Sequence, residues 1–216
     1  NDPSIRDRIR ATGLPWRISA RTTGIEMVLV PPGKCMLGAS HDDAEGDQDE
    51  HAANEFAILK PFYVGVYQVT QSEWLKGMRV NPSKFRGEHL PVDSVDWADL
   101  QQFLGKSDGL RLPTEREWEY ACRAGTTTPF HSGPGFPNGT TAERLAVQVA
   151  WFANSGGFGT RPVGGLAANA LGIHDMHGNV YEWCSDYWSN YTATPKTDPA
   201  GPPTGSDRVL RGGAFP

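Results

Sequence analysis

The sequence predicts one α+β domain in which short strands and a few helices are joined by much irregular backbone. The 216 residues include 25 Gly and 17 Pro, which favour turns over long regular elements. Runs of β-branched and aromatic residues, typical of strands, occur along the same chain as apolar stripes at helical spacing. A chain of this length normally forms one domain with a substantial core.

The first part of the chain has a different composition from the rest. Residues 1–23 are polar and basic, and Ile5, Ile9 and Leu14 are too sparse to predict a helix. We therefore interpret residues 1–23 as an N-terminal arm or linker and residues 24–216 as the domain.

Three strands are predicted near the start of the domain. Residues 25–30 are mostly apolar and end at a Pro-Pro-Gly turn, and residues 34–37 are expected to return as their hairpin partner. Residues 61–69 are rich in aromatic and β-branched side chains and partly alternate, which predicts the third strand.

Two helices are predicted from the spacing of a capping box, in which a Thr hydroxyl and a Glu three residues later satisfy exposed backbone amides. Thr70 and Glu73 begin a short helix that runs through Met78. Thr114 and Glu117 begin another, which carries a buried stripe and ends near a glycine.

A further helix is predicted between these two. Ser94 is the expected N-cap, and Gly105 or Gly109 is the expected end. One face of the helix is expected to enter the core and carries Trp97, Leu100 and Leu104.

Two long segments show no helical or strand period. Residues 41–55 are rich in Asp, Glu and His; their carboxylates could hold a hard cation, but they lack the positions of an EF-hand and are expected to form a solvated loop. Residues 125–171 combine Gly, Pro, Asn and Thr with isolated aromatic residues, which predicts packed loops.

Charge and hydropathy exclude some classes of partner. A net charge of −5 offers no cationic surface for phosphates, so nucleic acid is not an expected partner. No apolar run approaches the roughly 20 residues that span a bilayer, and no signal peptide is recognisable. Cys35, Cys122 and Cys184 have neither disulfide nor zinc spacing and are expected to be buried thiols.

Several ordered motifs carry a resemblance to a known family. The most specific are Leu-Arg-Leu-Pro-Thr-Glu-Arg-Glu-Trp-Glu-Tyr-Ala at 110–121, Gly-Asn-Val-Tyr-Glu-Trp at 178–183 and Arg-Gly-Gly at 211–213. With them, the chain from residue 24 onward resembles the formylglycine-generating enzyme, or sulfatase-modifying factor, family. The resemblance implies a C-type-lectin-like fold of short antiparallel strands, few helices and many loops. The other matching segments are residues 27–33, 36–38, 61–70, 81–85, 91–92, 95–97, 122–125, 162–164, 169–177 and 208–210.

The resemblance also implies where catalytic residues would lie. In catalytic members, a cysteine pair downstream of the Arg-Gly-Gly motif binds copper and oxidises a sulfatase cysteine to formylglycine. None of the three cysteines here matches those positions, so copper is expected only if a further C-terminal segment supplies the pair. Family members also have their last strands beyond this motif, and these strands are expected to be missing from residues 24–216.

A structural calcium site is implied around the Gly-Asn-Val-Tyr-Glu-Trp turn. The ligands carried over are Asp175, the carbonyl oxygens of Gly178 and Val180, and Glu182, which together form a hard oxygen set suited to Ca²⁺. The alternative interpretation is a plain turn, in which Glu182 caps backbone amides and Trp183 enters the core.

Two functions follow from these observations. The first is a non-catalytic module that binds a protein or a glycan, as the lectin-like fold and the resemblance to variable proteins of diversity-generating retroelements imply. The second is a copper-dependent formylglycine-generating oxidase whose cysteines lie in a further C-terminal segment. The residues do not indicate the oligomeric state, the ligand or the compartment.

Overall fold

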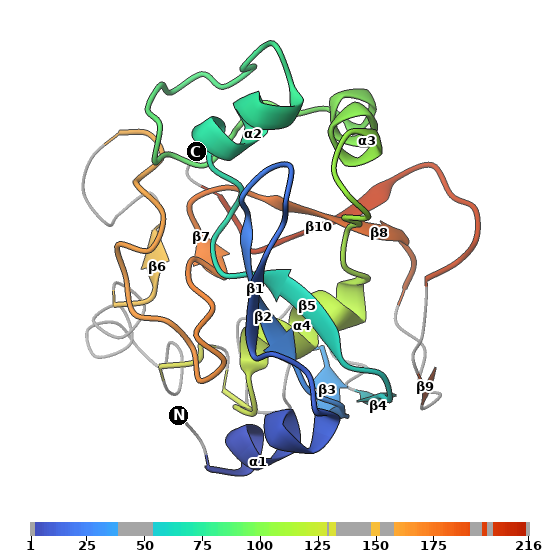
Figure 1. Ribbon diagram of the computed structural model, residues 1–216. Helices are drawn as coiled ribbons and strands as arrows, with labels where there is room; N and C mark the ends of the chain where they lie inside the picture. Colours follow the sequence, from blue (N-terminus) through green and yellow to red (C-terminus); the bar gives the residue numbers. More distant parts are fainter. Residues whose placement is uncertain are drawn as a thin grey trace.

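The computed structural model describes residues 3–38, 54–128, 130–132, 148–151, 158–190, 196–197 and 201–214 (Figure 1). Its helices are α1 (Pro3–Thr12), α2 (Gln71–Gly77), α3 (Trp97–Gly105) and α4 (Glu115–Arg123). Its strands are β1 (Arg17–Ser19), β2 (Glu26–Val30), β3 (Gly33–Leu37), β4 (Asn54–Ile58), β5 (Phe62–Gly65), β6 (Ala150–Trp151), β7 (His177–Gly178), β8 (Glu182–Tyr187), β9 (Lys196–Thr197) and β10 (Arg208–Arg211).

The strands form several small sheets rather than one large one. Within the described residues the sheet orders are β1-β2-β5, β3-β4-β9, β10-β8 and β6-β7. Most pairs are antiparallel, whereas β4–β9 and β6–β7 are parallel. The α+β class with short strands and many loops is therefore confirmed.

The predicted hairpin between the first two domain strands is wrong. β3 pairs with β4, where Cys35 lies opposite Phe56, and not with β2. Both edges of β2 are occupied, by β1 on one side and by β5 on the other. Because a strand can pair only along its two edges, the Pro-Pro-Gly turn sends the chain into a second sheet.

The N-terminal segment, expected to be an arm or linker, contains a helix and a strand that pack on the rest of the domain. Ile5 of α1 is only 3% exposed and Ile9 packs against the same core. The Arg8 guanidinium donates hydrogen bonds to the Pro32 carbonyl (3.3 Å) and the Tyr120 hydroxyl (3.0 Å). Two apolar positions four residues apart are enough to dock this short helix.

Both capping boxes are present, at the starts of α2 and α4. In each, the Thr side chain accepts from the third helical amide and the Glu side chain accepts from the cap amide. The third helix begins differently from the prediction, because Asp96 and not Ser94 is the N-cap of α3. Ser94 has φ of 59° and its hydroxyl donates to the Asp93 carboxylate (2.8 Å).

Two cores hold the elements together. The larger core joins α1, β2, α4, β8 and the segment before β7, and Val30, Ala121 and Cys184 have no exposed surface. The smaller core lies at the other end of the domain, where α2 and α3 sit opposite α1 (Figure 1). There Trp74 stacks on Phe103 with ring centroids 4.8 Å apart.

Parts of two predicted loops lie outside the described residues. These are residues 41–53 of the acidic run, and residues 129, 133–147 and 152–157 of the aperiodic stretch. None of the described helices has the length and apolarity needed to cross a membrane.

Candidate functional site

The backbone around β7, from Asp175 to the turn that leads into β8, has an unusual conformation. Asp175, Gly178 and Asn179 all have positive φ, of 59°, 88° and 66°. The position of Gly178 has no room for a side chain, because a Cβ there would collide with the Trp151 backbone. The Asn179 side chain accepts from the Arg161 amide (2.9 Å) and donates to the Arg161 carbonyl (3.1 Å). The turn is therefore pinned to the neighbouring loop.

Three of the predicted calcium ligand atoms, from Gly178, Val180 and Glu182, surround one side-chain nitrogen together with the Asp175 carbonyl oxygen. The Gln68 amide nitrogen, Nε2, lies within hydrogen-bond distance of the carbonyl oxygens of Asp175, Gly178 and Val180, 3.1 Å from each. It also lies 2.9 Å from Glu182 Oε1. We call these four oxygens the oxygen cage. Sequence reasoning missed Gln68, which lies 107 residues before Asp175 and carries no motif of its own.

Asp175 contributes a different atom from the one predicted. Its main-chain oxygen, and not its carboxylate, belongs to the oxygen cage. The carboxylate accepts from the Gly164 amide through Oδ2 (2.6 Å), while Oδ1 is buried without a hydrogen-bond partner among the described residues. Burial raises the pKa of this carboxyl group.

The two carboxylate oxygens of Glu182 accept hydrogen bonds from side chains. In the alternative interpretation, a plain turn, they would accept from backbone amides. Glu182 Oε1 accepts from Gln68, and Oε2 accepts from the Trp118 indole nitrogen (3.0 Å). Burial raises the pKa of Glu182, and these two hydrogen bonds partly offset that effect. The half-buried Trp183 meets Trp97 edge to face.

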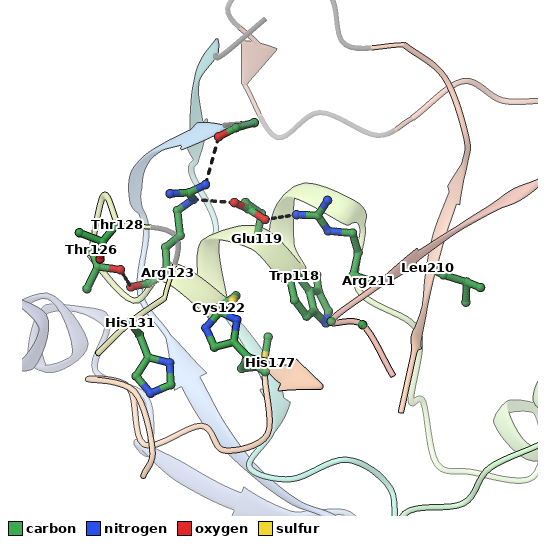
Figure 2. A pocket seen from close by; sticks show the side chains of 14 residues that line it. Trp118, Glu119, Cys122, Arg123, Thr126, Thr128, His131, His177, Leu210 and Arg211 are labelled. Atoms are coloured by element: carbon green, nitrogen blue, oxygen red, sulfur yellow. Dashed lines mark hydrogen bonds and ion pairs between the residues drawn. The ribbon is translucent and has the colours of Figure 1, made fainter. Parts of the chain in front are cut away.

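A pocket of about 300 Å³ opens beside the Arg-Gly-Gly motif (Figure 2). Residues of α4, β7 and β10 line it, together with residues after α4. Cys122 Sγ lies 3.8 Å from His177 Nε2, and the His177 ring stacks on His131 with centroids 5.2 Å apart. Two imidazoles and a thiol therefore share one wall.

A buried ion network forms another part of the pocket lining. Glu119 bonds to Arg123 Nε (2.5 Å) and to the Arg211 guanidinium, so that it holds two cations (Figure 2). Arg211 also lies 3.6 Å from Glu115, and Arg123 donates to the Gly38 carbonyl (3.1 Å). These contacts join α4 to β10 and to the end of β3.

The thiol and imidazole in the pocket are neutral near pH 7. Burial raises the pKa of Cys122 well above its ordinary value. Burial, aided by His131, lowers the pKa of His177 to about 4. The pocket therefore offers hydrogen-bonding imidazoles and guanidinium groups, and no thiolate nucleophile.

The lowered pKa of His177 predicts a loss of stability in mild acid. The unfolded chain binds a proton near pH 6.5 and the folded chain only near pH 4, so the free energy of unfolding falls as the pH drops between these values. The loss from His177 between about pH 7 and pH 4.5 is about 2 kcal/mol. Urea unfolding at both pH values measures it.

The matched variants for this experiment are His177→Gln and His89→Gln. H177Q should lose less stability than the wild type over this pH range, whereas H89Q, which changes an exposed side chain, should lose as much. An identical pH slope in the wild type and H177Q would show that His177 is not the source.

The described residues contain no cluster of metal-binding side chains. No group of three or more His, Cys, Asp and Glu residues in the described ranges is placed to hold an ion. The cysteines Cys35, Cys122 and Cys184 are free thiols. Burial raises the pKa of Cys35 to about 12 and raises that of Cys184 as well.

Comparison with known proteins finds related sequences and related structures. The chain is 38% identical over 254 residues to the formylglycine-generating enzyme of Bos taurus, covering 88% of this chain and 66% of that protein. The structure of PvdO from Pseudomonas aeruginosa superimposes with a TM-score of 0.77 at 28% identity, covering 93% of this chain and 87% of that one. Treponema denticola variable protein 1 gives 0.76 at 25% identity, covering 93% and 88%.

The family model of the sulfatase-modifying factor enzyme 1-like domain matches residues 17–216, and so includes β1 and the strands that follow it. The match contains the capped helix α4, the turn that carries the oxygen cage and the Arg-Gly-Gly motif beside the pocket. This chain belongs to the sulfatase-modifying factor enzyme 1-like domain family.

Proposed function

We propose that this chain is a non-catalytic module that binds a protein or glycan ligand in the pocket beside the Arg-Gly-Gly motif. The observation that carries the proposal is a polar pocket in which the Cys122 thiol and the His177 imidazole are uncharged and in contact. Its one thiol, Cys122, is protonated and contacts a neutral His177, which suits hydrogen bonding better than nucleophilic attack.

The size and lining of the pocket support a small, polar ligand group. About 300 Å³ is at the lower end for ligand sites and fits one or two side chains or a single sugar ring. The stacked rings of His131 and His177 offer a flat face, and Arg123 and Arg211 are held in place by Glu119. Such preorganised groups lose little entropy on binding.

The test is a screen of the purified protein on a glycan array and a peptide library, followed by calorimetry of any ligand found. His131→Ala should weaken binding at least about tenfold, because it removes half of the stacked pair. His89→Ala, which changes an exposed residue, should bind as the wild type does. A ligand that binds H131A as tightly as the wild type would rule out the pocket as its site.

A second candidate is the copper-dependent oxidase, favoured by the 38% identity to the bovine formylglycine-generating enzyme. The described thiols do not fit the copper, which needs two neighbouring thiolates, because burial raises the pKa of Cys35, Cys122 and Cys184. Copper(I) titration of the full-length natural protein, with mass spectrometry of a Cys-x-Pro-x-Arg peptide, distinguishes the two. Conversion of the peptide to the aldehyde would replace the binding proposal.

We also propose that the oxygen cage is a structural calcium site. Three carbonyl oxygens and the Glu182 carboxylate converge on one point, and hard oxygen ligands of this kind suit Ca²⁺. Bound calcium would supply positive charge to the turn between β7 and β8. Calcium titration of the wild type and of Glu182→Gln tests this, because the variant should bind less tightly.

A further inference from the structure

The side-chain nitrogen of Gln68 is surrounded by more acceptor oxygens than it has hydrogens to donate. A carboxamide nitrogen carries two hydrogens, yet Nε2 of Gln68 lies 2.9–3.1 Å from all four oxygens of the cage. The other end of the same group, Oε1, is buried and accepts no hydrogen bond from the described residues. Gln68 itself is only 7% exposed. Two of the four acceptors therefore lack a hydrogen of their own.

The arrangement is that of a site built around a positive centre. The three carbonyl dipoles point their negative ends at the same place as the Glu182 carboxylate, and oxygens so gathered repel each other unless something positive lies between them. The backbone of the turn cannot relax easily, because Gly178 abuts Trp151 and Asn179 is bonded to Arg161.

We infer that the Gln68 carboxamide substitutes for the cation in the oxygen cage. Its partly positive NH₂ group lets the turn fold without metal, and calcium enters only by displacing it. The displacement is required because Nε2 occupies the point on which the four oxygens converge. Residue 68 therefore sets the calcium dependence of this domain. The inference rests on the calcium assignment proposed above.

The test removes the NH₂ group while keeping the shape of the side chain. Gln68→Met should lower the Tm in EDTA by about 5–10 °C, because the buried oxygens lose their donor. Millimolar Ca²⁺ should restore most of this loss in Q68M and should change the wild-type Tm little. Calorimetry should show a calcium Kd at least about tenfold lower for Q68M than for the wild type.

Gln71→Met is the matched control. Gln71 is also a buried glutamine, 2% exposed, and its amide donates to the carbonyls of Phe85 (2.7 Å) and Pro91 (3.1 Å), away from the oxygen cage. Q71M should lower the Tm as well, but calcium should not restore it. Restoration of Q71M by calcium would mean a general effect of the ion and would overturn the inference.

A second variant covers the case in which Q68M does not fold. Gln68→Glu places a carboxylate against the four oxygens, so Q68E should depend on calcium more strongly than Q68M does. If neither variant gains stability from calcium, the inference is wrong.

The results separate this inference from the calcium assignment. Calcium rescue of Q68M or Q68E with no binding by the wild type supports substitution by Gln68 and refutes calcium as a cofactor of the natural chain. Tight binding by the wild type, with no tighter binding by Q68M, refutes the substitution and keeps calcium as a cofactor.

Discussion

Replacing Glu119 by Gln is expected to lower the free energy of unfolding by about 3–5 kcal/mol. Glu119 is 5% exposed and is the carboxylate that joins Arg123 to Arg211. Removing its charge leaves two largely buried guanidinium groups with less compensation, although Arg211 keeps its ion pair with Glu115. Urea unfolding followed by tryptophan fluorescence measures the change.

The matched control is Glu55→Gln, which breaks an ion pair with Lys34 on the surface. Both side chains of that pair are more than half exposed, so the expected change is below about 1 kcal/mol. If E119Q and E55Q lose the same stability, the ion network in the pocket wall does not hold α4 to β10. E119Q should also weaken any ligand that contacts Arg123, since the guanidinium would lose its fixed position.

Replacing Asn169 by Ala is expected to cost about 3–5 kcal/mol, the second large effect. The Asn169 side chain donates to the carbonyls of Ala121 (2.7 Å) and Cys122 (3.1 Å) at the end of α4. Its oxygen accepts from the amides of Leu171 (3.0 Å) and Ile173 (3.1 Å). The substitution leaves four buried backbone groups without these partners. Thermal and urea unfolding measure the loss.

Two further variants make this prediction specific. Asn169→Asp keeps the acceptor but sets an oxygen against the two helix carbonyls, so N169D should be destabilised too. Asn190→Ala, at an exposed position, should change stability by less than about 0.5 kcal/mol. A loss in N169A as small as that in N190A would mean that water replaces all four hydrogen bonds.

The parts of the fold that depend on neighbours in sequence could be predicted. The capping boxes at Thr70 and Thr114 each need only four consecutive residues, and both helices begin where expected. α3 also lies where its apolar spacing placed it, although its cap is Asp96, two residues after Ser94. α1 was missed because Ile5 and Ile9 are a weak signal until the core they enter is known.

Strand pairing could not be predicted in the same way. The residues of β3 have strand character, but which strand they pair with depends on whether the edges of β2 are already taken. The pairing depends on contacts between segments far apart in the chain, so it cannot be predicted from local propensity.

The family resemblance, the two capped helices and the turn at residues 178–183 could be recognised from the sequence, because each depends on a short motif. The positions of the Asp175 carbonyl and of Gln68 at the centre of the oxygen cage depend on the folded structure and could not be predicted. The tertiary structure also decided that residues of α4, β7 and β10 meet in one pocket. The physical reason is that these contacts join residues brought together by burial of a common core.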